Sequence, residues 1–127
     1  MTKKELKELI ELPMTNFGNA LRLQYLFGKR WVYLPKYRYW VYRDTHSWKG
    51  KRTREVIYDA CDAFRHLAQD IYRMSEPEEE WERDQIVRAI AWLTLSQCTA
   101  RARHAVHLFR DMQMAEEMIR EDVLRDN

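Results

Sequence analysis

The chain has 127 residues, 46% of them hydrophobic and 33% charged, which predicts one globular domain and excludes an intrinsically disordered chain. The formal net charge is only +2, and no apolar run reaches the roughly 18 residues of a membrane span, so we expect no membrane contact. The start of the chain carries no signal-peptide pattern, and Cys61 and Cys98 lack a CxxC spacing. Both features favour a cytoplasmic protein with free thiols.

Two short helices are predicted first. Residues 3–12 alternate charged residues with aliphatic residues at helical spacing, and Pro13 ends this segment. Thr15 is suited to cap a second helix over residues 16–27. Gly28 then stands where a glycine often ends a helix.

A basic, aromatic segment follows, from Lys29 to Arg54. It contains nine Lys or Arg residues and one acid, Asp44, so it carries a formal charge of +8 while the rest of the chain carries −6. This uneven distribution, rather than the net charge, is the informative feature, and it suits contact with a polyanion. Seven aromatic residues are interleaved with the charges: Trp31, Tyr33, Tyr37, Tyr39, Trp40, Tyr42 and Trp48.

The same segment predicts a small β-hairpin. Residues 31–34 and 39–43 are rich in strand formers, and Pro35 with Lys36 favours a turn between them. A short third strand at Trp48 would extend the hairpin to a ribbon. Two short strands are marginal alone, so we expect them to pack against a helix.

Longer helices are predicted after the hairpin. Thr53 can cap a helix over residues 54–74, whose apolar positions form one buried stripe. A capping box with the sequence Ser75-Glu76-Pro77-Glu78 precedes a helix over residues 79–95. A last helix covers residues 97–124.

Ser96 either caps this last helix or marks a bend in a continuous one. In both cases the protein is mainly α, with four to five helices and a small antiparallel β-hairpin or three-stranded ribbon near residues 31–48. No linker is long enough to divide the chain, so a single helical domain spans residues 1–127.

Two motifs resemble a known family. Thr15-Asn16-Phe17-Gly18-Asn19-Ala20-Leu21-Arg22 is followed by Trp40-Val41-Tyr42-Arg43-Asp44 and then by Trp48. The family tends to read Thr-Asp-x-Gly-Asn-Ala-x-Arg and then a Trp-rich hairpin that ends Asp-Gly-x-x-Trp, and the run from Ala91 to Arg101 is similar as well. Over residues 15–110 the chain therefore resembles the domain that precedes the superfamily-three helicase in phage, plasmid and poxvirus-type primase–helicases.

The resemblance implies a domain that connects the primase region to a hexameric helicase and contributes to a collar near DNA. Its partners would be DNA, a replicative helicase or primase, or further copies of itself in a homo-oligomer. The chain departs from the family where Asn16 replaces the usual Asp, which makes the cap neutral. Thr45 replaces the usual Gly, so we expect either a less tight turn after Asp44 or a Thr45 strained into a positive φ. The chain would be an excised part of a larger replication protein or a small standalone relative.

The chain lacks the residues that several enzymatic activities require. The chain has no G-x-x-x-x-G-K-[ST] loop and no evident primase-type carboxylate cluster, so we expect no enzyme activity and no cofactor. The acids between Glu76 and Glu82 suit a helix N-terminus, which explains them without a metal. His104 and His107 lack a further ligand at metal-binding spacing.

The candidate DNA contacts are basic residues, which would neutralise phosphates while aromatic rings stack on unpaired bases. We expect Trp40 and Trp48 to be buried against helices. We also expect Asn19 and Arg22 to hydrogen-bond the hairpin onto the second helix. The six candidates are Arg38, Arg43, Lys49, Lys51, Arg52 and Arg54.

Two functions stay open. In the first, a non-catalytic DNA-handling accessory module, the cations from Lys49 to Arg54 are exposed and unpaired. In the second, a protein-interaction or oligomerisation (collar) module without direct DNA contact, the same cations pair with an acidic surface, such as residues Glu76 to Glu82 of a neighbour.

Overall fold

The computed structural model describes residues 1–43, 47–74, 77 and 79–126, the last six of them through their backbone only. The protein is mainly α with a three-stranded antiparallel sheet, which confirms the predicted fold class. None of the described helices is both long enough and apolar enough to cross a membrane. The elements, in chain order, are α1 (Lys3–Glu11), α2 (Asn16–Phe27), β1 (Trp31–Leu34), β2 (Tyr39–Arg43), β3 (Trp48–Lys51), α3 (Thr53–Met74), α4 (Glu80–Leu95) and α5 (Thr99–Asp126).

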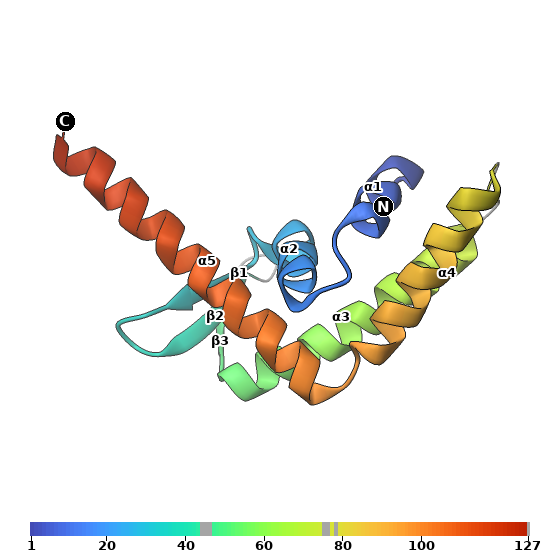
Figure 1. The fold of residues 1–127 in the computed structure, drawn as a ribbon. Coiled ribbons are helices and arrows are strands. Elements are labelled where there is room, and N and C mark those ends of the chain that lie inside the picture. The colour runs from blue at the N-terminus through green and yellow to red at the C-terminus, as the bar shows by residue number, and fades with distance from the viewer. Residues whose placement is uncertain (44–46, 75–76, 78, 127) are drawn as a thin grey trace.

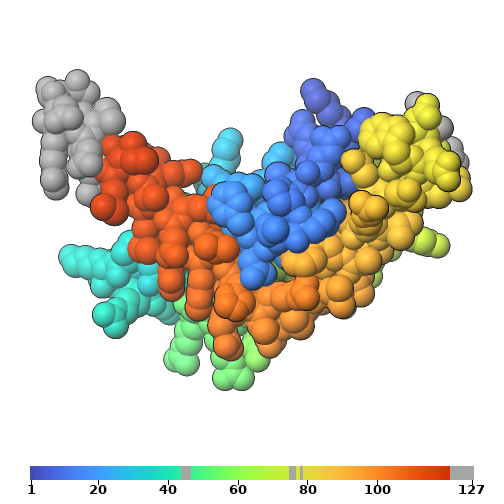
Figure 2. All heavy atoms as spheres, in the orientation of Figure 1, coloured from blue at the N-terminus to red at the C-terminus, as the bar shows by residue number. Residues whose placement is uncertain are grey.

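The long helices frame the molecule. In Figure 1, α3 and α4 lie side by side, α2 packs against α5, and the sheet lies below α5. The C-terminal part of α5 extends beyond the other elements. The space-filling view of Figure 2 shows the same outline, with the hairpin projecting from the body. The sheet therefore lies at one end of the molecule, and the start of α4 lies at the other.

Local capping explains where the first two helices begin. The backbone N–H of Glu5 donates to Thr2 Oγ1 over 3.1 Å, and the Thr2 N–H donates back to the Glu5 carboxylate over 3.4 Å, which forms a capping box. Thr15 caps α2 as predicted, because its Oγ1 accepts a 3.0 Å bond from the N–H of Gly18. At position 18 only glycine fits, since a Cβ there would lie 1.8 Å from the carbonyl oxygen of Pro13.

The sheet has two unlike faces. Its strands pair in the order β1-β2-β3, and residues directly opposite each other in an antiparallel pair share a face. We call the face that packs on the helices the packed face and the other the outer face. The packed face carries Trp31, Tyr33, Trp40, Tyr42, Lys49 and Lys51. The outer face carries Val32, Leu34, Tyr39, Val41, Arg43, Trp48 and Gly50.

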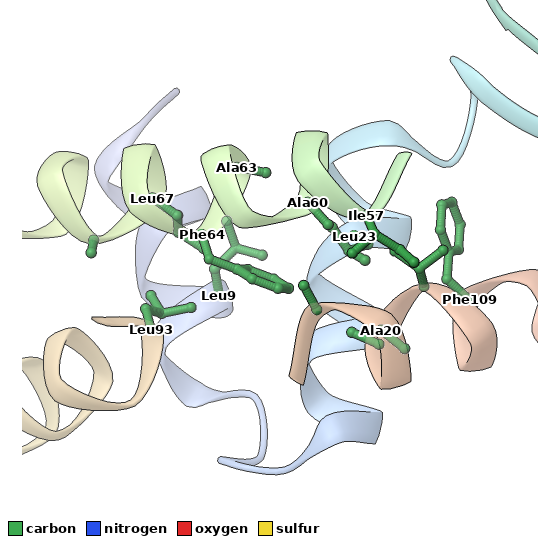
Figure 3. Close-up of a cluster of buried hydrophobic side chains, with 14 of the residues drawn as sticks. Leu9, Ala20, Leu23, Ile57, Ala60, Ala63, Phe64, Leu67, Leu93 and Phe109 are labelled. Atoms are coloured by element: carbon green, nitrogen blue, oxygen red, sulfur yellow. The ribbon is translucent and has the colours of Figure 1, made fainter. Parts of the chain in front are cut away.

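The hydrophobic core joins the helices to the packed face. Figure 3 shows Phe64 of α3 among side chains from α1, α2, α4 and α5. The core reaches the sheet through Trp40, which is 1% exposed and whose ring centroid lies 5.7 Å from that of Phe109. Trp31 stacks on Phe27 at 4.0 Å and so ties β1 to the end of α2. The buried stripe predicted for α3 is confirmed at Val56, Ala60, Ala63, Leu67 and Ile71.

Three local predictions need correction. Trp48 is 54% exposed rather than buried, because its register opposite Arg43 places it on the outer face. Thr53 is the first residue of α3 and not its cap, since the carbonyl of Arg52 already accepts from the N–H of Val56. Ser96 is neither the N-cap of α5 nor a bend in a continuous helix, because it is the C-cap of α4 and α5 begins only at Thr99.

Two predicted features cannot be compared with the structure. The capping box at Ser75, Glu76, Pro77 and Glu78 lies outside the described residues except for Pro77. The turn that follows Asp44, including Thr45, also lies outside them.

Candidate nucleic-acid interface

The outer face of the sheet carries two exposed aromatic rings and an exposed arginine. Tyr39 and Trp48 keep 37% and 54% of their surface exposed. Arg43 lies directly opposite Trp48, so the two side chains are neighbours on this face. The Lys51–Asp59 and Trp40–Phe109 contacts of α3 and α5 lie on the packed face. On the outer face, Val32 and Leu34 of β1 line a hollow beside α5, whereas Arg43 and Trp48 at the other end of the face are exposed. An exposed aromatic and basic surface of this kind calls for a functional explanation.

Gly50 sets the position of the Tyr39 ring. A Cβ at position 50 would lie 2.1 Å from Cε1 of Tyr39, closer than any real contact. The ring therefore lies against the backbone of β3, in the space that a larger residue at position 50 would fill. Glycine is needed here for close approach and not for an unusual backbone angle.

Arg38 stands in the turn between β1 and β2, with its side chain exposed. Its backbone has a φ of 51°, in the left-handed region that ordinarily costs a non-glycine residue about 1 kcal/mol. Its N–H donates to the carbonyl of Pro35 over 3.3 Å, and the N–H of Tyr37 donates to that of Leu34 over 3.1 Å. The turn thus holds a strained arginine at the tip of the hairpin, next to Tyr39.

Two of the predicted lysines lie on the packed face. Lys51 forms a salt bridge with Asp59 of α3, and its Nζ lies 4.4 Å from the centroid of the Tyr42 ring. Burial lowers the pKa of Lys51. The hydrogen bond and the charge of Asp59 together raise it by a larger amount, so the net shift of the pKa is upward. Lys49 lies opposite Tyr42 and is exposed. Lys51 therefore fastens β3 to α3 in the free protein.

The remaining two candidates surround the start of α3. Arg52 precedes the helix and Arg54 lies in its first turn, both with exposed side chains. The guanidinium of Arg54 lies 5.8 Å from the centroid of the Tyr58 ring. The six predicted residues are therefore spread over the hairpin tip, both faces of the sheet, and the passage from β3 to α3, and they do not form a single cluster.

Asn19 and Arg22 are buried structural residues, but the predicted partner was wrong. They do not hold the hairpin. Arg22 donates to the carbonyls of Leu9, Leu12 and Pro13 over 2.8 to 3.0 Å, at the end of α1. Burial lowers the pKa of Arg22 to about 10, so it stays protonated at neutral pH. The cation sits where orphan carbonyls and the helix dipole favour positive charge.

Asn19 connects α2 to the end of α4. Its Nδ2 donates to Ser96 Oγ over 2.9 Å, and its Oδ1 accepts from Trp92 Nε1 over 2.8 Å. Ser96 in turn donates to the carbonyl of Trp92 over 2.8 Å. Asn19 and Ser96 are fully buried, so this network specifies how α2 meets α4.

Gln113 is a supporting residue that the sequence does not reveal. Its side-chain Nε2 donates to the carbonyl of Trp31 over 2.7 Å, and its Oε1 accepts from the N–H of Tyr33 over 3.0 Å. The amide thus pairs with the free edge of β1 as a neighbouring strand would. A single glutamine in an amphipathic helix gives no local signal of this role.

The acids of α4 lie far from the sheet. Glu79 and Glu80 are exposed at the start of α4, which Figure 1 places at the opposite end of the molecule from the sheet. Within one copy these acids cannot pair with the cations of the sheet. Among the described residues, no group of three or more His, Cys, Asp or Glu side chains is placed to hold a metal ion.

The residues of the two sequence motifs divide between the interior and the surface. Asn19 and Arg22, which carry the first motif, are buried and position helices. Trp40 of the second motif belongs to the core, whereas Trp48 is exposed. Comparison with models of known protein families, with curated proteins and with solved structures finds no match to this chain.

Proposed function

We propose that this protein is a non-catalytic DNA-handling module, of the kind that accompanies a phage or plasmid replication primase–helicase. The observation that carries the proposal is the exposed β2–β3 part of the outer face, where Arg43 lies beside Trp48. Arg38 at the hairpin tip and Arg52 beyond β3 extend the positive charge to both sides. Cations arranged in this way neutralise phosphates and release counterions, which drives binding to nucleic acid.

The helices and the hydrophobic core hold the sheet that carries this surface in place. Gln113 pairs with the free edge of β1, and the Lys51–Asp59 salt bridge fastens β3 to α3. Trp40 anchors β2 in the core. Because the three strands are held in place before binding, little conformational entropy is lost when a ligand is bound.

The test is fluorescence anisotropy with labelled DNA across a salt series. The first variant changes Arg38, Arg43 and Arg52 to Ala. The matched control changes Arg73, Arg83 and Arg88 to Ala, three exposed arginines of α3 and α4. If the first three arginines make phosphate contacts, their loss flattens the slope of log affinity against log salt by about 2 to 3, and the control leaves the slope unchanged. Equal effects of the two variants, or no binding by the wild type at low salt, would contradict the proposal.

The second candidate function is a protein-interaction or collar module, and the separation of charge along the molecule favours it. The basic sheet and the exposed acids Glu79 and Glu80 lie at opposite ends. A head-to-tail contact would pair the acids of one copy with Arg52 and Arg54 of the next, and repeated contacts of this kind close into a ring when the rotation permits.

Sedimentation velocity separates the two candidates. A collar module forms oligomers at low salt that dissociate at high salt. The change of Glu79 and Glu80 to Lys, or of Arg52 and Arg54 to Glu, should each abolish association. Mixing the two variants should restore association, because each variant then meets an opposite charge at both ends of the other, and the assemblies should contain the two variants in equal amounts. A monomer under all conditions would remove this candidate for the isolated chain.

A further inference from the structure

We infer that the outer face of the sheet is a stacking surface for unpaired bases, so that the DNA bound by this module is single-stranded. This inference rests on the proposed DNA-handling function and names its substrate class. It starts from the two aromatic rings that the face exposes, Tyr39 and Trp48. Aromatic side chains held on a sheet surface bind bases of single strands through their faces, with little dependence on sequence.

The positions of Tyr39 and Trp48 suit unpaired, separated bases and not the covered bases of a duplex. The Tyr39 ring lies at Gly50, which is two residues from Trp48 along β3. Two residues of a strand span about 7 Å. Consecutive bases in a duplex are separated by roughly 3.4 Å and have their faces covered by their neighbours. Only a strand whose bases are unpaired and separated can place one base on each ring.

The Tyr39 ring is also prepared for stacking. Because Gly50 lacks a side chain, the ring lies close to the backbone of β3, and the residue remains 37% exposed. A ring that is already positioned loses little rotamer freedom on binding. Gly50 is therefore a positioning residue for Tyr39 under this inference.

The charges around the rings suit the phosphates of a strand that crosses the face. Arg43 lies beside Trp48, and Arg38 precedes Tyr39 in the chain. None of the three strands contains an acidic residue. The backbone of a bound strand would therefore meet cations at both rings and no carboxylate from the strands themselves.

The experiment measures fluorescence anisotropy with a labelled 20-nucleotide oligothymidine and with a labelled 20-base-pair DNA duplex. The variants are Tyr39→Ala, Trp48→Ala and Gly50→Ala, and Trp48→Phe tests whether an aromatic ring is sufficient. The matched control is Trp81→Ala, which removes a similarly exposed tryptophan from α4, 51% exposed against 54% for Trp48. Urea unfolding of every variant shows whether the fold is intact.

We expect Tyr39→Ala and Trp48→Ala each to weaken single-strand binding about five- to a hundredfold and duplex binding less than about twofold. Gly50→Ala should weaken single-strand binding in the same direction, because the added Cβ displaces the ring. Trp48→Phe should retain most of the affinity, and Trp81→Ala all of it.

Two failures are distinguishable. If the wild type binds both DNA forms and the aromatic variants bind as the wild type does, the stacking inference is overturned and the proposed function stands. If the wild type binds neither form at low salt, the proposed function fails, and the stacking inference fails with it.

Discussion

Nη1 of Arg22 donates a 3.1 Å hydrogen bond to Oδ1 of Asn19, and both side chains are fully buried. This bond joins the two halves of a polar network that fastens α1 and α4 to α2. No acidic side chain pairs with the guanidinium among its hydrogen bonds within the described chain, and backbone carbonyls hold the charge instead. The stability of the helical body therefore depends on Arg22, whose structural role the sequence predicted but whose partners it did not.

Replacement of Arg22 by Met should destabilise the protein by about 3 to 5 kcal/mol. The change leaves three carbonyls at the end of α1 without their donor, and each unsatisfied buried group costs about 1 to 3 kcal/mol. Arg22→Lys should have a stability between those of the wild type and Arg22→Met, since one ammonium group cannot reach all of these acceptors. Urea unfolding gives the free energies, with Arg65→Met on the exposed face of α3 as the control. A cost below about 1 kcal/mol for Arg22→Met would contradict this role.

Gln113→Ala should cost about 1 to 3 kcal/mol and loosen the hairpin. Loss of the amide leaves the carbonyl of Trp31 and the N–H of Tyr33 without their partner. Hydrogen exchange should become faster at Tyr33 and remain unchanged in the middle of α3. If both the stability and the exchange rate at Tyr33 are unaffected, water replaces the glutamine without penalty.

Alanine substitution of the two hairpin tryptophans should reduce stability by very different amounts. Trp40→Ala should cost about 3 to 5 kcal/mol, because it empties a fully buried site. Trp40→Phe should cost far less, since Nε1 of Trp40 has no hydrogen-bond partner among the described residues. Trp48→Ala should cost under about 1 kcal/mol, as expected for an exposed residue. Chemical denaturation of the three variants ranks them, and equal costs for the two alanine variants would refute the assignment of faces.

The contribution of the Lys51–Asp59 salt bridge to the free energy of unfolding should decrease as the pH rises in the alkaline range. The folded-state pKa of Lys51 is raised above its ordinary value of 10.5, so the folded protein holds this proton more tightly than the unfolded chain. The stabilisation is fully present below the unfolded pKa and is lost as the pH rises through the folded pKa. The difference in unfolding free energy between the wild type and Lys51→Met should therefore be constant from pH 7 to 9 and shrink above about pH 10.5. A difference that does not change with pH would show that the pair contributes nothing.

Arg38→Gly should leave the fold unchanged or up to about 1 kcal/mol more stable. Glycine adopts the φ of 51° without the penalty of a side chain, although it also gains freedom in the unfolded chain. If Arg38 contacts DNA, the same variant binds DNA more weakly, so that stability and binding change in opposite directions. Thermal unfolding and anisotropy on one preparation measure both. Clear destabilisation by glycine would indicate that the side chain of Arg38 supports the turn.

Local patterns were sufficient for the secondary structure. Periodicity placed α2 over residues 16–27, and the ends of α3, α4 and α5 came within one or two residues of the structure, except where Thr53 was taken as a cap. Strand formers placed β1 and β2. These features depend on neighbours that are close in the chain, and the sequence states those neighbours directly.

Tertiary structure alone decided which side chains are exposed and which residues they meet. Alternation says that Trp48 and Gly50 share a face, but only the register opposite β2 shows that it is the outer face with Tyr39 and Arg43. Asn19 meets Ser96 across 77 residues of chain. The sequence by itself determined the elements and the uneven charge, because both follow from local composition. The open aromatic face and the buried network arise from packing between distant segments, which no local pattern encodes.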